Sequence, residues 1–210
     1  LVLGGTRFLG RHLADLALAR GHRVTLLHRG RSGAGLFPQA EHLIADRNAD
    51  LSLLDGRRFD AVVDTSAYWP RQVHEVAARL AGRVGHYQMV STISVYAAPD
   101  AGPLTEDAPL ATLADPATET VTGETYGGLK VLWEQAAVAG FGSGRCLLPR
   151  PGLLVGPHDP TERFTWWVRR LLRAQPGSEL LAPGDPAAAV QFIDARDAAA
   201  RLLAQAEAGP

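Results

Sequence analysis

Tyr126 and Lys130 are the residues whose types and spacing most directly suggest chemistry. They stand four positions apart in Tyr126-Gly127-Gly128-Leu129-Lys130, and on a helix this spacing puts both side chains on one face. A nearby ammonium favours the phenolate and lowers the pKa of a tyrosine, which prepares it as a general acid or base. The pair therefore predicts proton transfer at Tyr126.

The composition of the chain strengthens the case for Lys130. One of the 21 basic side chains is Lys and the others are Arg, and four of the 210 residues are Tyr. A Tyr four positions before the only Lys rarely arises by chance in such a chain. Arg is bulkier than Lys and does not give up its proton. A Lys that is retained in an Arg-rich chain indicates a position where Arg would be a poor replacement.

A glycine-rich turn follows the first apolar run and precedes a helical pattern. Its residues are Gly4, Gly5, Thr6, Arg7, Phe8, Leu9 and Gly10. Glycines at such a turn let the backbone approach a pyrophosphate, which then lies on the helix N-terminus. Arg7 replaces the usual middle glycine, and its guanidinium can bind an adenosine phosphate. The turn predicts a dinucleotide site.

The end of the second predicted strand indicates which dinucleotide binds. An NAD site usually has Asp or Glu there to hold the ribose 2'-hydroxyl, but this chain has His28-Arg29-Gly30-Arg31. No carboxylate in this run repels a 2'-phosphate, and two Arg are within reach. We therefore expect NADP as the cofactor, with NAD as the alternative if these Arg are ordinary surface residues.

A run of hydroxyl side chains ends the fifth predicted strand, in Val90-Ser91-Thr92-Ile93-Ser94-Val95-Tyr96. A hydroxyl at this point could hold a substrate carbonyl or alcohol beside Tyr126. Strands commonly end in Ser and Thr, so this run predicts a catalytic hydroxyl only in combination with the other motifs.

Apolar runs alternate with helical patterns along the chain. Strands are expected at 1–3, 24–27, 42–45, 61–63, 87–91, 147–148 and 190–193, and helices at 8–20, 70–81, 122–139, 159–173 and 195–209. This order predicts a doubly wound α/β fold, Rossmann-like, with a mostly parallel sheet of roughly seven strands. We expect a dinucleotide-binding domain over 1–155 and a small, partial substrate-binding region over 156–210. This second region is expected to be interleaved with the last strand and helix of the dinucleotide-binding domain. The long loop 97–121 is expected to be a functional flap.

Charge and composition exclude several classes of protein. The net charge of −1 gives no electrostatic footprint for nucleic acid or an anionic membrane. The single cysteine, Cys146, excludes a disulfide framework, and the scattered His residues lack metal-ligand spacing, so we expect surface or packing roles for them and no metal. No apolar run is long enough for a membrane span. The chain opens inside an apolar run without Met, so its natural N-terminus is expected upstream, and we expect a cytoplasmic protein.

The motifs in this order resemble the extended short-chain dehydrogenase/reductase superfamily, and within it the NAD(P)-dependent epimerase/dehydratase family. The resemblance extends to Arg150-Pro151-Gly152, Gly156-Pro157 and the late run Val190 to Asp197. It implies that Thr92 is the catalytic hydroxyl, Tyr126 the acid or base, and Lys130 a ligand of the nicotinamide ribose as well. Further cofactor contacts implied by the resemblance are Asp46, Arg47, Thr65, Ser66 and Pro151.

Three departures from the family pattern shape the expected function. Arg7 resembles an atypical subgroup that includes chloroplast stem-loop-binding proteins. Leu153 stands where nucleotide-sugar enzymes usually have Asn, which argues against a nucleotide-sugar substrate and slightly favours a reductase over an epimerase. Ile93-Ser94 follow Thr92 where the sugar dehydratases have Asp-Glu, so elimination chemistry is not expected. Members of the family are usually longer than this chain, which is why a partial substrate region is expected.

The leading hypothesis is thus an NADP(H)-dependent reductase or epimerase that acts on a small molecule. Two alternatives stay open: a non-catalytic nucleotide-binding or RNA-associated protein of the stem-loop-binding type, and a cofactor-sensing regulator. The neutral charge and the Tyr126/Lys130 pair both count against RNA binding. Wide apolar faces on the predicted helices 70–81 and 122–139 permit a homodimer and equally fit core packing.

Overall fold

The computed structural model describes residues 1–33, 35–98, 102, 104–182, 184–188 and 190–209. Its centre is a six-stranded parallel sheet in the order β3-β2-β1-β4-β5-β6. The strands are β1 (Val2–Leu3), β2 (Thr25–His28), β3 (Glu41–Ile44), β4 (Phe59–Asp64), β5 (Val84–Met89) and β6 (Cys146–Leu147). The order reverses direction at β1, which makes the sheet doubly wound and confirms the predicted Rossmann-like fold.

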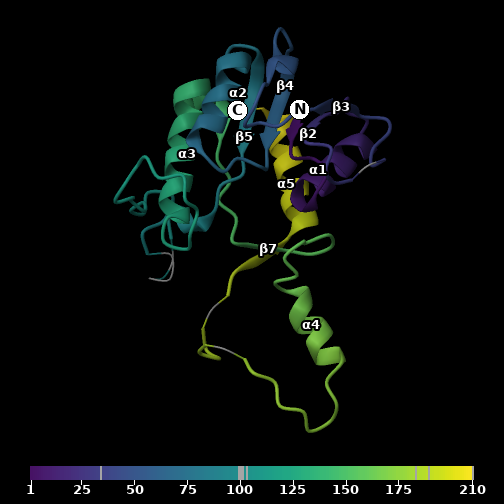
Figure 1. The fold of residues 1–210 in the computed structure, drawn as a ribbon, viewed down its shortest axis with the longest axis vertical. Helices are drawn as coiled ribbons and strands as arrows, with labels where there is room; N and C mark the ends of the chain where they lie inside the picture. The colour runs from purple at the N-terminus through teal and green to yellow at the C-terminus, as the bar shows by residue number, and fades with distance from the viewer. Residues whose placement is uncertain (34, 99–101, 103, 183, 189, 210) are drawn as a thin grey trace.

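Helices cover both faces of this sheet (Figure 1). Helices α2 (Pro70–Leu80) and α3 (Tyr126–Phe141) lie on one face, while α1 (Phe8–Ala19) and α5 (Ala195–Ala208) lie on the other. Neighbouring strand residues serve opposite faces: Leu3 packs under α2 and α3, and Val2 packs under α1 and α5. Burial on both faces explains why the strands read as short apolar runs rather than as alternating patterns.

The main sheet has one strand fewer than the sequence suggests. The run predicted at 190–193 forms β8 (Phe192–Asp194), which pairs with β7 (Leu153–Val155) in a separate two-stranded parallel sheet. Strand β7 lies outside the strands predicted from the sequence. These two short strands connect the body of the molecule to a protruding segment (Figure 1).

The fourth helix begins later than predicted. The pattern Asp159-Pro160-Thr161-Glu162 suggested a helix start, but the Asp159 carboxylate instead accepts hydrogen bonds from the backbone N–H and the hydroxyl of Thr161. Glu162 then has a left-handed backbone with a φ of 50°. This turn delays helix α4 to Thr165–Leu172.

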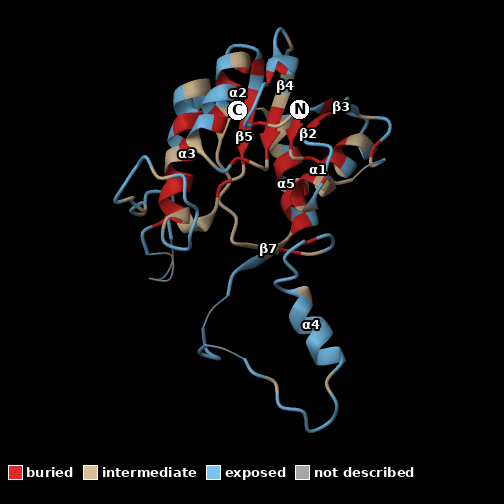
Figure 2. Ribbon diagram, viewed as in Figure 1, coloured by how far each residue is buried: buried red, intermediate tan, exposed pale blue. Residues whose placement is uncertain are grey.

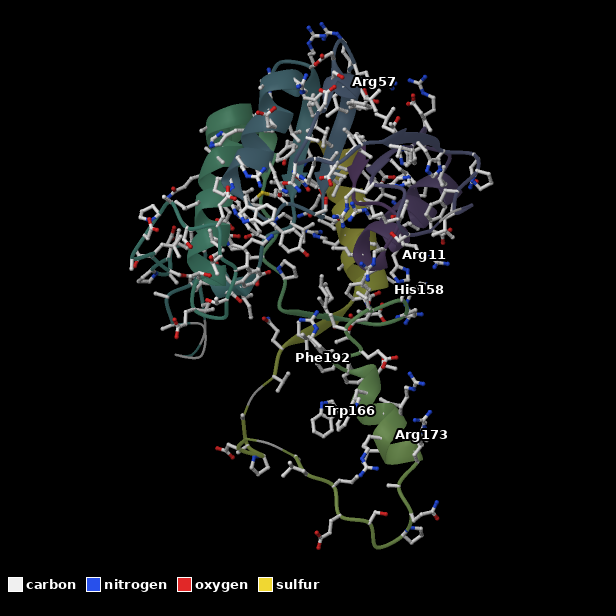
Figure 3. All side chains as sticks on the ribbon, viewed as in Figure 1. Arg11, Arg57, His158, Trp166, Arg173 and Phe192 are labelled. Atoms are coloured by element: carbon white, nitrogen blue, oxygen red, sulfur yellow. The ribbon has the colours of Figure 1, made fainter. Side chains whose placement is uncertain are left out.

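The segment between β7 and β8 extends away from the body and is mostly exposed (Figure 2). Its side chains include Trp166 on α4, and Phe192 lies where the segment returns to the body (Figure 3). The rings of Phe164 and Phe192 lie tilted against each other at a centroid distance of 5.6 Å and join the two arms of the segment. None of the helices in the described ranges is long and apolar enough to cross a membrane.

Candidate active site

The glycine turn connects β1 to α1 at the carboxyl edge of the sheet. Gly4 has a φ of 90°, and a Cβ there would lie 2.8 Å from the Cβ of Ser66. The neighbouring Thr65 hydroxyl donates a hydrogen bond to the Leu3 carbonyl at 2.9 Å. Glycine is therefore required for the turn to lie against the end of β4. The structure brings Thr65 and Ser66 beside the glycine turn, as the sequence analysis expected of cofactor contacts.

The start of α1 is open to a ligand. Arg7 is its N-cap residue, and no side chain in the described structure caps the first turn. Phe8 has a φ of 40°, a left-handed value that costs an ordinary residue free energy and is found disproportionately at functional sites. The first N–H groups of a helix carry partial positive charge. The turn thus has the donors that a pyrophosphate needs.

The predicted adenosine side of the site lies at the ends of β2 and β3. Arg7 and Arg29 are both exposed. Arg29 and Arg31 lie close enough to the Asp46 carboxylate to help lower its pKa, although the larger cause is a hydrogen bond from the Asn48 backbone. His28, at the end of β2, hydrogen bonds to His42 on β3. The partnership of His42 with a predicted site residue was missed.

Arg47 is predicted as a cofactor contact, and the structure buries it against Asp64. The guanidinium donates to both carboxylate oxygens at 2.8 Å and also to the Ser66 hydroxyl at 3.0 Å. Tyr87 donates a further hydrogen bond to the same carboxylate. Removing one member of a buried pair leaves an uncompensated charge, so the pair holds the ends of β3 and β4 together. Arg47 thereby supports Ser66.

Thr92 and Tyr126 are brought together by glycines at the start of α3. Gly127 lies so close to the Ser94 carbonyl that a Cβ there would overlap its oxygen, and a Cβ on Gly128 would lie 2.6 Å from the Leu113 side chain. The first approach holds the start of α3 against the segment that carries Thr92, and the second holds it against the loop that carries Leu113. The Tyr126 hydroxyl then lies close enough to the Thr92 side chain for Thr92 to influence its pKa.

Helix α3 begins at Tyr126, four residues later than predicted. Before it, the backbone N–H of Thr122 donates to the Thr125 hydroxyl at 2.9 Å, and the Thr125 N–H donates to the Thr122 hydroxyl at 3.2 Å. Hydroxyl side chains of this kind offer the backbone an alternative to helix. Tyr126 therefore stands in the first turn, facing the edge of the sheet where the strands end.

The pKa of Tyr126 is raised above its ordinary value. Burial is the larger cause, and the nearby Thr92 side chain opposes it. Arg163, which follows the Gly156-Pro157 turn, also lowers this pKa. The direction differs from the sequence-based expectation that Lys130 lowers it, because the Lys130 ammonium is directed elsewhere in this arrangement. Arg163 was not among the predicted site residues.

Lys130 is buried at the same edge. Its Nζ donates a hydrogen bond to the Val90 carbonyl at 2.9 Å and lies 4.1 Å from the centroid of the Trp133 ring. Burial lowers the pKa of Lys130 to about 8, while the carboxylates of Asp64 and Glu134 oppose the shift. The ammonium is thus fixed beside the end of β5, next to the segment that carries Thr92.

The residues after β6 complete the edge. The Pro151 carbonyl accepts a hydrogen bond from the Ile93 N–H at 3.1 Å, so Pro151 lies against the Thr92 segment. Arg150 donates to both oxygens of Glu134 on α3 and to the Tyr96 hydroxyl. These bonds fix the strand end against α3. The predicted catalytic and cofactor residues therefore share one edge of the sheet.

One cavity among the described residues lies elsewhere. It has a volume of about 870 Å³ and is lined by Leu1, Arg57, Phe59 and Glu207, at the amino ends of the strands. Arg57 lies at the opposite end of the body from His158 (Figure 3). Ligands of doubly wound sheets bind at the carboxyl ends. The chemistry-bearing side chains, rather than this cavity, mark the candidate site. No cluster of potential metal ligands occurs in the described ranges.

Comparison with known families agrees with this geometry. A model of the NAD dependent epimerase/dehydratase family matches residues 1–210. The chain belongs to this family. Membership confirms the predicted resemblance and indicates an NAD-dependent epimerase/dehydratase-type enzyme. No curated protein sequence matches the chain closely.

Solved structures with the same fold come from related enzymes. A candidate epimerase from Burkholderia cenocepacia J2315 is 24% identical with a TM-score of 0.75, over 99% of this chain and 70% of that one. TunA, an NAD dependent NDP-hexosamine 5,6-dehydratase, is 22% identical with a TM-score of 0.72, over 97% and 70%. WbmH from Bordetella bronchiseptica, solved with NAD+, is 18% identical with a TM-score of 0.73, over 98% and 71%. At these identities the likeness shows the fold.

Proposed function

We propose that this protein is an NADP(H)-dependent reductase or epimerase that acts on a carbonyl or alcohol carbon of a small molecule. The observation that carries the proposal is the meeting of Thr92, Tyr126 and Lys130 at the carboxyl edge of the sheet, beside the open start of α1. A proton donor, an orienting hydroxyl and an ammonium together suit hydride chemistry at a carbon–oxygen bond.

The residues present fit a dinucleotide. The uncapped first turn of α1 offers N–H groups to a pyrophosphate, and the close approach of Gly4 to Ser66 leaves no room for a side chain there. Asp46 would contact the adenine, Thr65 and Ser66 would lie along the middle of the cofactor, and Pro151 and Lys130 would lie at the nicotinamide end. When bound, the nicotinamide supplies or accepts the hydride.

Tyr126 would move the proton of the substrate oxygen. Because burial raises the pKa of Tyr126, the hydroxyl form predominates near neutral pH and can donate to a carbonyl oxygen as it is reduced. Thr92 would orient that oxygen through its own hydroxyl. Lys130 would hold the ribose diol. This assignment favours the reductase direction.

The residue types near the site support reduction or epimerisation over elimination. Leu153 in β7 pairs with Phe192 in β8 and presents an apolar side chain. The residues after Thr92 are Ile93 and Ser94, which supply no carboxylate for removing a second proton from the substrate. We therefore infer reduction or epimerisation rather than elimination of water.

The preference for NADP rests on Arg7, His28 and Arg29. A 2'-phosphate beside a guanidinium gains charge-assisted hydrogen bonds, each worth about 1.5 to 3 kcal/mol when well formed. Because 1.4 kcal/mol is about a factor of ten, NADP(H) should bind at least tenfold more tightly than NAD(H). Arg7→Ala and Arg29→Ala should each reduce this preference and leave NAD(H) binding nearly unchanged, as measured by calorimetric titration of both cofactors.

Tyr126→Phe tests the catalytic assignment. It removes the proton donor and little shape, so cofactor affinity should stay within about threefold while turnover falls by about two orders of magnitude or more. Turnover would be measured on a panel of carbonyl and alcohol substrates with either cofactor. Tyr68→Phe is the comparison variant: it removes an exposed phenol that helps to raise the pKa of Tyr126 but is not assigned to proton transfer, so it should keep most of the turnover. Equal activity of Tyr126→Phe and the parent would overturn the assignment.

A further inference from the structure

His28, His42 and two backbone groups form a chain of hydrogen bonds at the end of β2. The Gly30 N–H donates to Nδ1 of His28 at 3.1 Å, Nε2 of His28 lies 2.8 Å from Nδ1 of His42, and Nε2 of His42 lies 3.0 Å from the Phe37 carbonyl. His28 pairs with Ile44 and His42 with Leu26 in the β2–β3 register, so both imidazoles point to the same face of the sheet.

The two ends of this chain fix its protonation. A backbone N–H can only donate, so Nδ1 of His28 carries no proton, and a carbonyl can only accept, so Nε2 of His42 carries one. With both rings neutral, the His28 Nε2–H must then donate to Nδ1 of His42. All four ring nitrogens are engaged. A further proton on His28 can enter only by breaking the bond from Gly30.

The lowered pKa of His28 agrees with a neutral pair, because burial and then the neighbouring His42 both disfavour its charge. The charged groups on the surrounding elements are Arg29 and Arg31 after β2, Asp46 after β3, and Arg7 in the glycine turn. The adjacent Glu41 is engaged elsewhere, since its carboxylate binds Arg57 and Thr25. Mostly positive charge therefore surrounds a neutral His28.

We propose that His28 reads the 2'-phosphate of the cofactor by taking up one proton as the phosphate binds. Nδ1 of His28 gains the proton from solvent, and the Gly30 N–H turns from Nδ1 to the phosphate. The imidazolium Nδ1–H and the Gly30 N–H then donate to phosphate oxygens, while the bond from His28 to His42 is kept. This inference rests on the proposed NADP preference and adds its pH dependence.

The expected signature is an affinity that falls as pH rises. Where free His28 is neutral and bound His28 is charged, each pH unit weakens 2'-phosphate binding by up to tenfold. A ligand that lacks the 2'-phosphate takes up no proton there and shows no such slope. The phosphate itself loses charge only near pH 6, and this acts in the opposite direction. A window from about pH 6.5 to 8.5 therefore isolates the histidine.

The test uses adenosine 2',5'-bisphosphate and 5'-AMP, which have no nicotinamide and need no turnover. Calorimetry in two buffers of different ionisation enthalpy, at about pH 7.5, should show uptake of close to one proton for the bisphosphate and none for 5'-AMP. In the same samples, NMR titration of the parent protein should show that the pKa of His28 rises when the bisphosphate binds. No proton uptake and no rise would overturn the proposal.

Variants separate this role from the cofactor proposal itself. His28→Asn keeps an acceptor for the Gly30 N–H and removes the titrating group, so it should abolish proton uptake and the pH slope, and weaken the bisphosphate more than tenfold at low pH. His74→Asn, on the exposed face of α2, should behave as the parent. Tight bisphosphate binding without proton uptake contradicts only the histidine role. Failure of both nucleotides to bind contradicts the proposed cofactor site.

Discussion

The Lys130 ammonium is held inside the protein by a carbonyl and an aromatic ring, and its burial lowers the affinity of Lys130 for its proton. Its pKa of about 8 lies below the ordinary value of 10.5. Between these two values the unfolded chain binds the proton that the folded chain has lost. The free energy of unfolding must therefore rise with pH across this window, because stability increases wherever the unfolded state binds more protons.

Lys130→Met should remove this pH dependence. The parent should gain stability relative to the variant between about pH 7.5 and pH 10, by on the order of 2 kcal/mol. Urea denaturation of both proteins at the two pH values measures the difference. A difference that stays constant with pH would show that Lys130 keeps its ordinary affinity for protons in the folded protein.

Lys130→Arg tests the inference drawn from the single Lys of the chain. The planar, bulkier guanidinium cannot take the place of Nζ between the Val90 carbonyl and the Trp133 ring without displacing one of them. We expect kcat/KM to fall at least tenfold although the charge is kept. Arg145→Lys, the reverse exchange at an exposed position, should leave kcat/KM unchanged. If Lys130→Arg had the same kinetics as the parent, the inference that Arg is a poor replacement at this position would be wrong.

At the level of residues, the sequence predicts those positions that lie in local motifs. Tyr126 and Lys130 share one helix, and the glycine turn is contiguous, so spacing alone groups them. Arg47 and Asp64 are separated along the chain and meet only because β3 and β4 end at the same edge. His42 required the register of β2 against β3. Pairings of this kind depend on strand order, which no local pattern contains.

Helix α3 shows how an element is positioned at the expense of its own stability. Ala would stabilise a helix over Gly by about 1 kcal/mol, yet Gly127 touches the Ser94 carbonyl too closely for a Cβ. Because a backbone oxygen cannot move aside, overpacking of about 1 to 3 kcal/mol should exceed the helix gain. Gly127 therefore serves this contact, which holds Tyr126 near Thr92.

Gly127→Ala should lower the thermal midpoint and reduce kcat by more than tenfold, because α3 must withdraw from the Thr92 segment. Gly123→Ala is the control, since a Cβ there would meet no atom within 4 Å. Thermal melts and turnover of the two variants measure the effect. Retention of both properties by Gly127→Ala would mean that α3 adjusts without disturbing Tyr126.

Helices α1, α2 and α5 follow their local patterns closely, whereas α4, β7 and β8 do not. Helices α1 and α2 start where the sequence predicts, since each has an unambiguous turn before its apolar face. The start of α4 is misread because the Asp159 turn uses the same residue types as a helix cap. The short strands β7 and β8 are stabilised by pairing with each other. Neither has a sequence periodicity that would predict this pairing.

The molecule as a whole consists of a packed body and an exposed segment, so its local stability should be uneven. Trypsin should cut first after the exposed Arg169, Arg170 and Arg173, where few buried contacts resist opening. The two fragments should then elute together on size exclusion, because α5 packs on α1 and the Gln88 side chain donates to the Leu202 carbonyl. Mass spectrometry identifies the cuts. First cuts in the body, for example after Arg83, would contradict this expectation.

The packing of α5 on α1 also determines when, during translation, the apolar face of α1 is covered. A ribosome releases the N-terminal part first, and domains fold as their parts become available. The apolar face that α1 shares with Leu202 and Leu203 has no cover until residues 195–208 have been synthesised. A nascent chain halted before that point would expose this apolar helix face to chaperones, and synthesis of residues 195–208 is needed to cover it.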